Sequence, residues 1–144
     1  MGFAHGTAGI GYAFSQLFNI TREEKFKDAC LKAFRFEDQF YNAQWSNWQI
    51  LGAINSEDPF VIHHARYQSK WCHGAAGIGL SRIAGYIHTN DLQALQMIHS
   101  ACRAAINAEP VTNNYSLCHG HLSNAELLLH AGSFLMMLFI STRV

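Results

Sequence analysis

The chain carries Trp71-Cys72-His73-Gly74-Ala75-Ala76-Gly77-Ile78 near its centre, where a cysteine and a histidine precede a run of small residues. The start of this pattern recurs as Leu117-Cys118-His119-Gly120, and a copy with alanine in place of cysteine occurs earlier as Ala4-His5-Gly6-Thr7-Ala8-Gly9-Ile10-Gly11. Three copies of one motif indicate a fold built by repetition. Two thiolates and one imidazole are also a ligand set of open, catalytic zinc sites, so we expect a metal at the centre of the repeats.

Composition and charge limit the possible classes of function. Apolar residues make up 49% of the 144 residues, and ten lysines and arginines balance ten aspartates and glutamates. Because there is no excess of positive charge, we expect no nucleic-acid partner and no binding to an anionic membrane surface. The residues before His5 do not resemble a signal peptide, so we expect a cytoplasmic, reducing location. Cys30 and Cys102 are then predicted to be buried, small apolar residues.

The most apolar run of the chain extends over residues 127–140. It is shorter than the roughly 18 residues that suggest a membrane span, and His130, Gly132 and Ser133 interrupt it. We therefore predict a buried helix and no membrane-spanning segment. A helix that is apolar on all sides is typical of a position inside a ring of other helices.

Two further segments have the pattern of outer, amphipathic helices. Thr21 and Glu24 form a capping box, and apolar residues then recur at helical spacing, which predicts a helix over about residues 22–41. Asn90 or Thr89 is predicted to cap a second amphipathic helix, whose apolar face begins with Leu92. Both helices have a polar side that should face solvent.

Small or apolar segments follow each glycine motif and predict three inner helices, over about residues 10–18, 78–87 and 125–140. Alternating inner and outer helices indicate an all-α fold, and specifically part of an α/α toroid in which the motif loops converge at one end. Residues 42–70 form the longest connection, and a connection of that length is usually functional or poorly ordered. Its Trp45 and Trp48 are predicted to pack within the loop.

The two cysteine motifs carry a resemblance. Residues 71–80, together with Leu117-Cys118-His119-Gly120-His121-Leu122-Ser123-Asn124, look like the two zinc-ligand motifs of the lanthionine synthetase C-like family. Histidine after the first cysteine resembles the C-terminal cyclase domain of the bifunctional, class II lanthipeptide synthetases. The opening His5-Gly6 motif and the Asn47-Trp48 pair are similar to features that the family has in the same order. The resemblance implies that residues 1–144 are a partial cyclase domain whose N- and C-terminal repeats are missing.

The resemblance also implies an activity, namely the addition of a peptide cysteine thiol to dehydroalanine or dehydrobutyrine, which forms lanthionine or methyllanthionine. Cys72, Cys118 and His119 would hold Zn²⁺, and His5 would handle a proton. The residue types suit this chemistry, because a free thiol with a pKa of about 8.5 reacts as its thiolate and metal coordination supplies that form at neutral pH. The implied partners are a dehydrated precursor peptide and either the remainder of a larger synthetase or complementary repeats.

Three alternatives remain open from the residues. A structural zinc ion would need a fourth protein ligand, for which His73, His121 and His5 are candidates. The chain could be a non-catalytic fragment of the same fold that binds zinc or a thiol compound. An unrelated α/α-toroid enzyme is the third alternative, although the sequence contains no evident pair of catalytic carboxylates.

Overall fold

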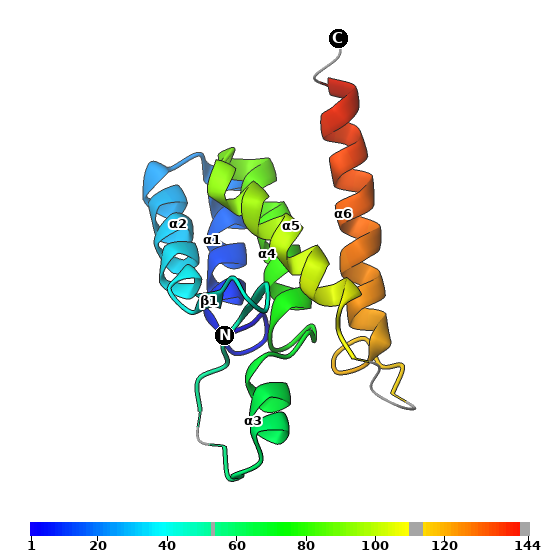
Figure 1. Ribbon diagram of the computed structural model, residues 1–144. Coiled ribbons are helices and arrows are strands. Elements are labelled where there is room, and N and C mark those ends of the chain that lie inside the picture. Colours follow the sequence, from blue (N-terminus) through cyan, green and yellow to red (C-terminus); the bar gives the residue numbers. More distant parts are fainter. Residues whose placement is uncertain (53, 110–113, 142–144) are drawn as a thin grey trace.

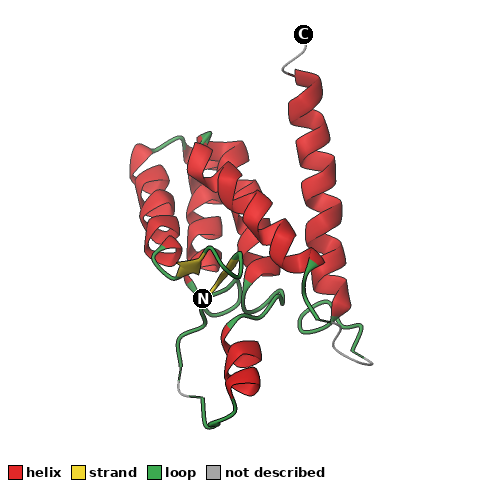
Figure 2. Cartoon of the chain, viewed as in Figure 1, coloured by secondary structure: helices red, strands yellow, loops and turns green. Residues whose placement is uncertain are grey.

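The computed structural model describes residues 1–52, 54–109 and 114–141, and this part of the chain is mostly helical (Figure 1, Figure 2). Two helices come first, α1 (Thr7–Thr21) and α2 (Glu24–Asp38). A two-stranded antiparallel hairpin follows, with β1 (Tyr41–Asn42) paired to β2 (Asn47–Trp48). The chain then forms α3 (Pro59–Arg66), α4 (Ala75–Thr89), α5 (Leu92–Ile106) and α6 (His121–Ser141). The prediction of an all-α fold is thus confirmed, apart from the short hairpin.

The main helices form two neighbouring pairs and one additional helix. Helix α1 packs against α2, α4 packs against α5, and α1 and α4 join the two pairs. Helix α6 packs against α4 and α5 and extends beyond them at one edge of the molecule (Figure 1). The three helices that follow the glycine motifs, α1, α4 and α6, all begin at the same end of the bundle (Figure 1). This arrangement brings the three motif loops to one end, as the sequence predicted.

Phe34 of α2 shows why the inner helices are rich in glycine. Its ring lies beside Gly11 of α1 and Gly85 of α4, and a Cβ atom at either position would lie 2.3 Å from a ring carbon. Arg82 of α4 lies over the same ring, with its guanidinium carbon 3.9 Å from the ring centroid. The two glycines therefore allow α1 and α4 to close around one fully buried aromatic side chain.

A buried ion cluster links α2, α4 and the hairpin. Arg82 and Glu37 are both 0% exposed, and Arg82 Nη2 donates to Glu37 Oε2 at 3.2 Å and to Asp38 Oδ1 at 2.9 Å. Trp48 Nε1 donates to the same Asp38 oxygen at 3.3 Å, and the Trp48 side chain is fully buried. The predicted packing role of Trp48 is confirmed, and the cluster fixes the hairpin against the helices.

Both predicted helix caps are wrong. Thr21 is the last residue of α1, where its hydroxyl donates to Leu17 O, and the cap of α2 is Glu23. Asn90 ends α4 in a left-handed conformation, whereas Asp91 caps α5 by accepting from Ala94 N at 3.0 Å. In both places the preceding helix extends further than the pattern indicates, through Thr21 and through Thr89, so the next helix begins one or two residues later.

Helix α6 is longer than its apolar run, and it is buried on one side only. Leu127, Ala131 and Phe134 are buried. The opposite side exposes Leu129, Met136, Met137, Phe139 and Ile140, so the prediction of all-round burial is wrong for this chain alone. By length and composition residues 121–140 could cross a membrane, and no other described helix meets this criterion, although core helices of soluble proteins meet it as well.

Candidate metal centre

Three ligand side chains converge at the end of the bundle where the motif loops meet. The ligand atoms of Cys72, Cys118 and His119 all lie within 4.8 Å of one another, and Cys118 Sγ lies 4.0 Å from His119 Nε2. Cys72 is buried, Cys118 is half-buried and His119 is exposed, so the group opens toward solvent. Within the described residues, no fourth histidine, cysteine or carboxylate joins this group. The structure therefore brings together the three residues that were predicted as metal ligands.

The donor set and its spacing suit one zinc ion. Zinc binds thiolate sulfur at about 2.3 Å and imidazole nitrogen at about 2.0–2.1 Å, so small side-chain rotations would bring all three atoms onto one ion. Burial, and then the neighbouring Cys118, raise the pKa of Cys72 above its ordinary value. Cys72 is consequently a neutral thiol at pH 7 when no metal is bound, and a metal ion must displace its proton.

Main-chain contacts hold the motif loops together. Ala4 N donates to Cys72 O at 3.3 Å, and Trp71 N donates to Cys118 O at 3.2 Å, so each motif is bonded to the next. Phe3 and Trp71 occupy equivalent places, directly before Ala4 and Cys72, and their ring centroids lie 5.0 Å apart. The relative position of the two cysteines is therefore set by backbone bonds as well as by helix packing.

The second and third motifs also share a turn. Ala75 N donates to Gln68 O at 3.1 Å, and His121 N donates to Asn114 O at 3.0 Å, which is the same bond in the two motifs. Gly74, at the start of α4, has φ +95°, and a Cβ atom there would lie 1.7 Å from Gln68 O. Glycine is required at this position for both reasons, because L-residues avoid positive φ and there is no space for a side chain.

Ser123 differs from the small-residue pattern, since Gly77 is its counterpart in the second motif. The Ser123 side chain is fully buried, and its hydroxyl donates to Gly120 O at 2.7 Å. The next residue, Asn124, accepts a hydrogen bond from Ser69 at 2.6 Å. These polar contacts join the start of α6 to the loop before α4, and the serine hydroxyl has a hydrogen-bond partner in its buried position.

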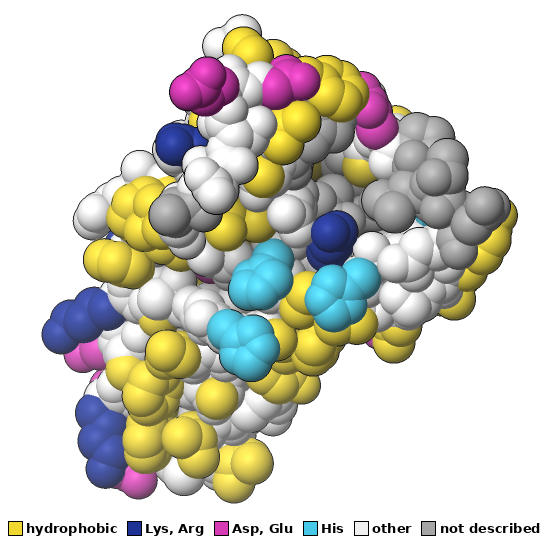
Figure 3. Space-filling model, turned by 90° about the horizontal axis from the view of Figure 1, so that it is seen from below, with side chains coloured by type: hydrophobic (Ala, Val, Ile, Leu, Met, Phe, Trp, Pro, Cys, Tyr) yellow, Lys and Arg dark blue, Asp and Glu magenta, His cyan; other side chains and the backbone are white. Residues whose placement is uncertain are grey.

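Histidines gather around the candidate ligands. The rings of His5 and His73 are 5.9 Å apart, and Figure 3, which views this end of the bundle, shows histidine side chains close together at the surface. Burial lowers the pKa of His73, and the nearby N-terminal amino group lowers it further. His5, His73 and His119 occupy the same position of the three motifs, so the repetition itself places them together.

Glu37 is a residue of this region that the sequence did not single out. Its Oε1 accepts from Gly2 N at 3.2 Å, so a buried carboxylate holds the start of the loop that carries His5. The remaining oxygen is held by Arg82. Burial raises the pKa of Glu37, and the charge of Arg82 opposes this shift. No local pattern could have revealed this contact, because it joins α2 to residues far away in the chain.

The comparisons with known proteins identify the family. A sequence model described as lanthionine synthetase C-like protein matches residues 1–135. The chain belongs to the lanthionine synthetase C-like family. Within this family, the lacticin 481/lactococcin biosynthesis protein LcnDR2 of Lactococcus lactis subsp. lactis is 28% identical over 135 residues, which are 88% of this chain and 13% of that protein. The nisin biosynthesis protein NisC of the same organism is 22% identical over 134 residues, which are 88% of this chain and 32% of that protein.

The resemblance stated from the motifs is thus confirmed. The chain spans about one eighth and one third of the lengths of these two relatives. No solved structure matches the chain.

Proposed function

We propose that this domain is the metal-binding part of a zinc-dependent lanthipeptide cyclase. The observation that carries the proposal is the convergence of Cys72, Cys118 and His119 on one open point, beside His5 and His73. The two curated relatives are named for the biosynthesis of lacticin 481/lactococcin and of nisin, which supports a role of this domain in the biosynthesis of a product of the same kind. The substrate would be a dehydrated precursor peptide that contains a cysteine and a dehydroalanine or dehydrobutyrine.

Cys72, Cys118 and His119 would hold the zinc ion and leave one position for a substrate sulfur. When bound, the ion lowers the pKa of a coordinated thiol, so that the peptide cysteine is a thiolate at neutral pH. The reaction forms one carbon–sulfur bond and breaks the carbon–carbon π bond of the dehydro residue. The thiol proton is lost from sulfur and a proton is added at the α carbon, so no other reactant is required.

His5 is the residue proposed to handle the proton. It is exposed, and its loop is fixed to Cys72 by the bond from Ala4 N and to Glu37 by the bond from Gly2 N. An imidazole titrates near neutral pH and can therefore accept the thiol proton or donate one to the α carbon. The ring of His73 lies 5.9 Å from that of His5, and its lowered pKa favours the neutral ring.

The open ligand group favours this function over a structural zinc ion. A structural site would need a fourth protein ligand, and His5 and His73 lie near the group without joining it in the described part of the chain. The proposal includes a reducing, cytoplasmic compartment, because Cys72 and Cys118 must remain thiols in order to bind zinc.

The proposal extends to the whole ring of helices. The exposed apolar side of α6 would be covered by further repeats of the same kind, which would close an α/α toroid around the metal centre. These repeats would belong to the remainder of a larger synthetase or to a complementary chain.

The test measures zinc content and ring formation together, in the protein that contains this domain. Ring formation is followed by alkylating the free thiols of the precursor after the reaction and counting the added alkyl groups by mass spectrometry, since a cysteine in a ring is not alkylated. Cys118→Ala should abolish both zinc binding and ring formation, whereas the matched variant Cys102→Ala, at a half-buried cysteine on α5, should retain both. Continued ring formation by Cys118→Ala would overturn the proposal. Zinc that is retained by the wild type without any ring formation would instead favour a non-catalytic zinc- or thiol-binding domain.

A second test concerns His5. His5→Ala should slow ring formation by roughly 100- to 10,000-fold, the usual contribution of a general acid or base, and should leave the zinc content unchanged. An unchanged rate in this variant would reduce His5 to a structural role.

A further inference from the structure

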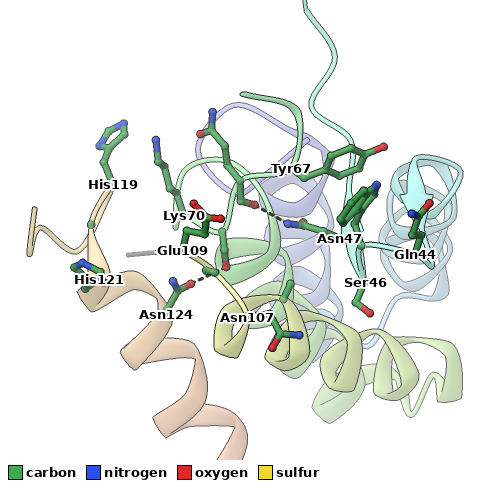
Figure 4. A pocket seen from close by; sticks show the side chains of 16 residues that line it. Gln44, Ser46, Asn47, Tyr67, Lys70, Asn107, Glu109, His119, His121 and Asn124 are labelled. Carbon is green, nitrogen blue, oxygen red and sulfur yellow. Dashed lines mark hydrogen bonds between the residues drawn. The ribbon is translucent and has the colours of Figure 1, made fainter. Parts of the chain in front are cut away.

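A cavity of about 540 Å³ lies directly beside the candidate metal centre. Its wall includes His119, and it is formed by the hairpin loop, the segment before α4, the end of α5 and the start of α6. In Figure 4, His119 and His121 lie at one end, Gln44 and Tyr67 lie at the other, and Lys70 and Asn107 lie between them. A ligand in this cavity would therefore have one end at a metal ligand and the other end at the hairpin.

The cavity presents side-chain amides that the fold does not use. The side chains of Gln44 and Asn107 make no hydrogen bond to any described residue, and Asn124 uses its Oδ1 for Ser69 while its Nδ2 remains available. Asn47 and Gln68 are different, because their amide groups already donate to the main chain of the fold. An amide offers both a donor and an acceptor, as does each residue of a peptide backbone. The available groups therefore match an extended peptide.

The charge of the cavity does not favour a phosphate or nucleotide ligand. Apart from its histidines, the described wall carries one cation, Lys70, and one anion, Glu109. The start of α6 lines the cavity, but a phosphate or nucleotide site usually also places several cations on the anion, and here the charge of Lys70 is balanced by that of Glu109. The volume falls within the range of about 300–1,000 Å³ of sites for small ligands, which accommodates a few residues of a peptide.

We propose that this cavity binds the residues that flank the reacting cysteine of the peptide substrate. The cysteine would lie at His119, and the neighbouring residues would extend across Asn124 and Asn107 toward Gln44 and Tyr67. This inference rests on the proposed function, since it assumes that a substrate thiol reaches the metal. It adds the place where the rest of the peptide is held, and it implies recognition of the backbone rather than of one particular sequence.

The test compares two thiols on the zinc-loaded chain. One probe is the acetylated and amidated hexapeptide Ala-Ala-Cys-Ala-Ala-Ala, and the other is N-acetylcysteine amide, which has the thiol but no flanking residues. Isothermal titration calorimetry should show at least tenfold tighter binding of the hexapeptide, about 1.4 kcal/mol. Equal affinity for the two probes would overturn the proposal.

Substitutions locate this advantage in the cavity. Asn107→Leu and Gln44→Leu should remove the tenfold difference and leave the affinity for N-acetylcysteine amide unchanged. Gln96→Leu is the matched control, because Gln96 is an exposed amide of α5 that does not line the cavity. Retention of the full advantage in Asn107→Leu and Gln44→Leu would show that the peptide binds elsewhere.

Failure of this inference can be distinguished from failure of the proposed function. Zinc analysis and the binding of N-acetylcysteine amide report on the metal centre alone. If the chain binds no zinc, the hexapeptide with serine in place of cysteine tests the cavity by itself. Binding of this peptide that Asn107→Leu abolishes would support the cavity site while the proposed function fails, and absence of binding would overturn both.

Discussion

Gly74→Ala tests how the start of α4 positions the metal ligands. Gly74 has φ +95° and ψ −159°, a conformation that costs about 1–3 kcal/mol for a residue with a side chain. The new Cβ atom would also lie 1.7 Å from Gln68 O, so the backbone must move and the Ala75 N to Gln68 O bond must lengthen or break. That bond contributes about 1 kcal/mol. The sum is about 2–4 kcal/mol, a large part of the roughly 5–15 kcal/mol that stabilises a typical domain.

The matched control is Gly132→Ala, in the middle of α6. A Cβ atom at Gly132 has no neighbour within 4 Å, and alanine is favoured over glycine in helices by about 0.5–1 kcal/mol. Urea unfolding followed by circular dichroism should therefore show a loss of stability for Gly74→Ala and a small gain for Gly132→Ala. Zinc affinity should fall only in Gly74→Ala, because Cys72 and His73 lie on the displaced loop. Stability and zinc affinity of Gly74→Ala that equal those of the wild type would refute the reasoning.

Three further predictions follow from burial. Arg82→Met should lower the free energy of unfolding by about 3–5 kcal/mol, because it leaves the buried carboxylate of Glu37 without its cation. Arg35→Met, at a partly exposed ion pair, should lower it by at most about 1 kcal/mol. Urea unfolding measures both values. Burial raises the pKa of Cys30 from 9.0 to about 11. Between these two pH values only the unfolded chain loses the thiol proton of Cys30. The free energy of unfolding should therefore fall by up to about 3 kcal/mol as the pH rises from about 9 to 11. Cys30→Ala should make the free energy of unfolding less dependent on pH in this range. Met137→Lys, on the exposed side of α6, should reduce self-association in light scattering and leave the helix content of the chain unchanged. Leu127→Lys, on the buried side of the same helix, should instead reduce the helix content.

The repeated motifs made the grouping of three candidate ligands predictable from the sequence. Cys72, Cys118 and His119 each follow from a local pattern, and the same pattern marks where α1, α4 and α6 begin. Equivalent loops that precede equivalent helices gather at one end of a bundle, so no knowledge of long-range contacts was required.

The features that were missed depend on contacts between distant segments. Glu37 and Arg82 are charged, and the sequence gives no sign that they are fully buried against each other. Arg82 lies among the small and apolar residues of an inner helix, and only the packing of α2 on α4 decides that its partner is Glu37. The cavity beside His119 combines four separate segments, so it could not be predicted from any one of them.

The position of the hairpin was missed for a related reason. Tyr41 pairs with Trp48 over a single pair of short strands, too few residues for an alternating pattern to appear. Helix α6 was expected to begin near residue 125 but begins at His121, because the turn closed by Asn114 O starts the helix directly after Gly120. In both cases a loop contact, and not residue periodicity, sets the boundary.

X-ray absorption at the zinc edge tests the central claim most directly, which is that Cys72, Cys118 and His119 hold an ion with one open position. The zinc-loaded chain should show two sulfur neighbours at about 2.3 Å and one imidazole nitrogen at about 2.0–2.1 Å, with the remaining neighbour a light atom that does not belong to the protein. Addition of N-acetylcysteine amide should raise the number of sulfur neighbours from two to three. A spectrum that shows four protein ligands and does not change on addition of the thiol would identify a closed, structural site and contradict the proposed function.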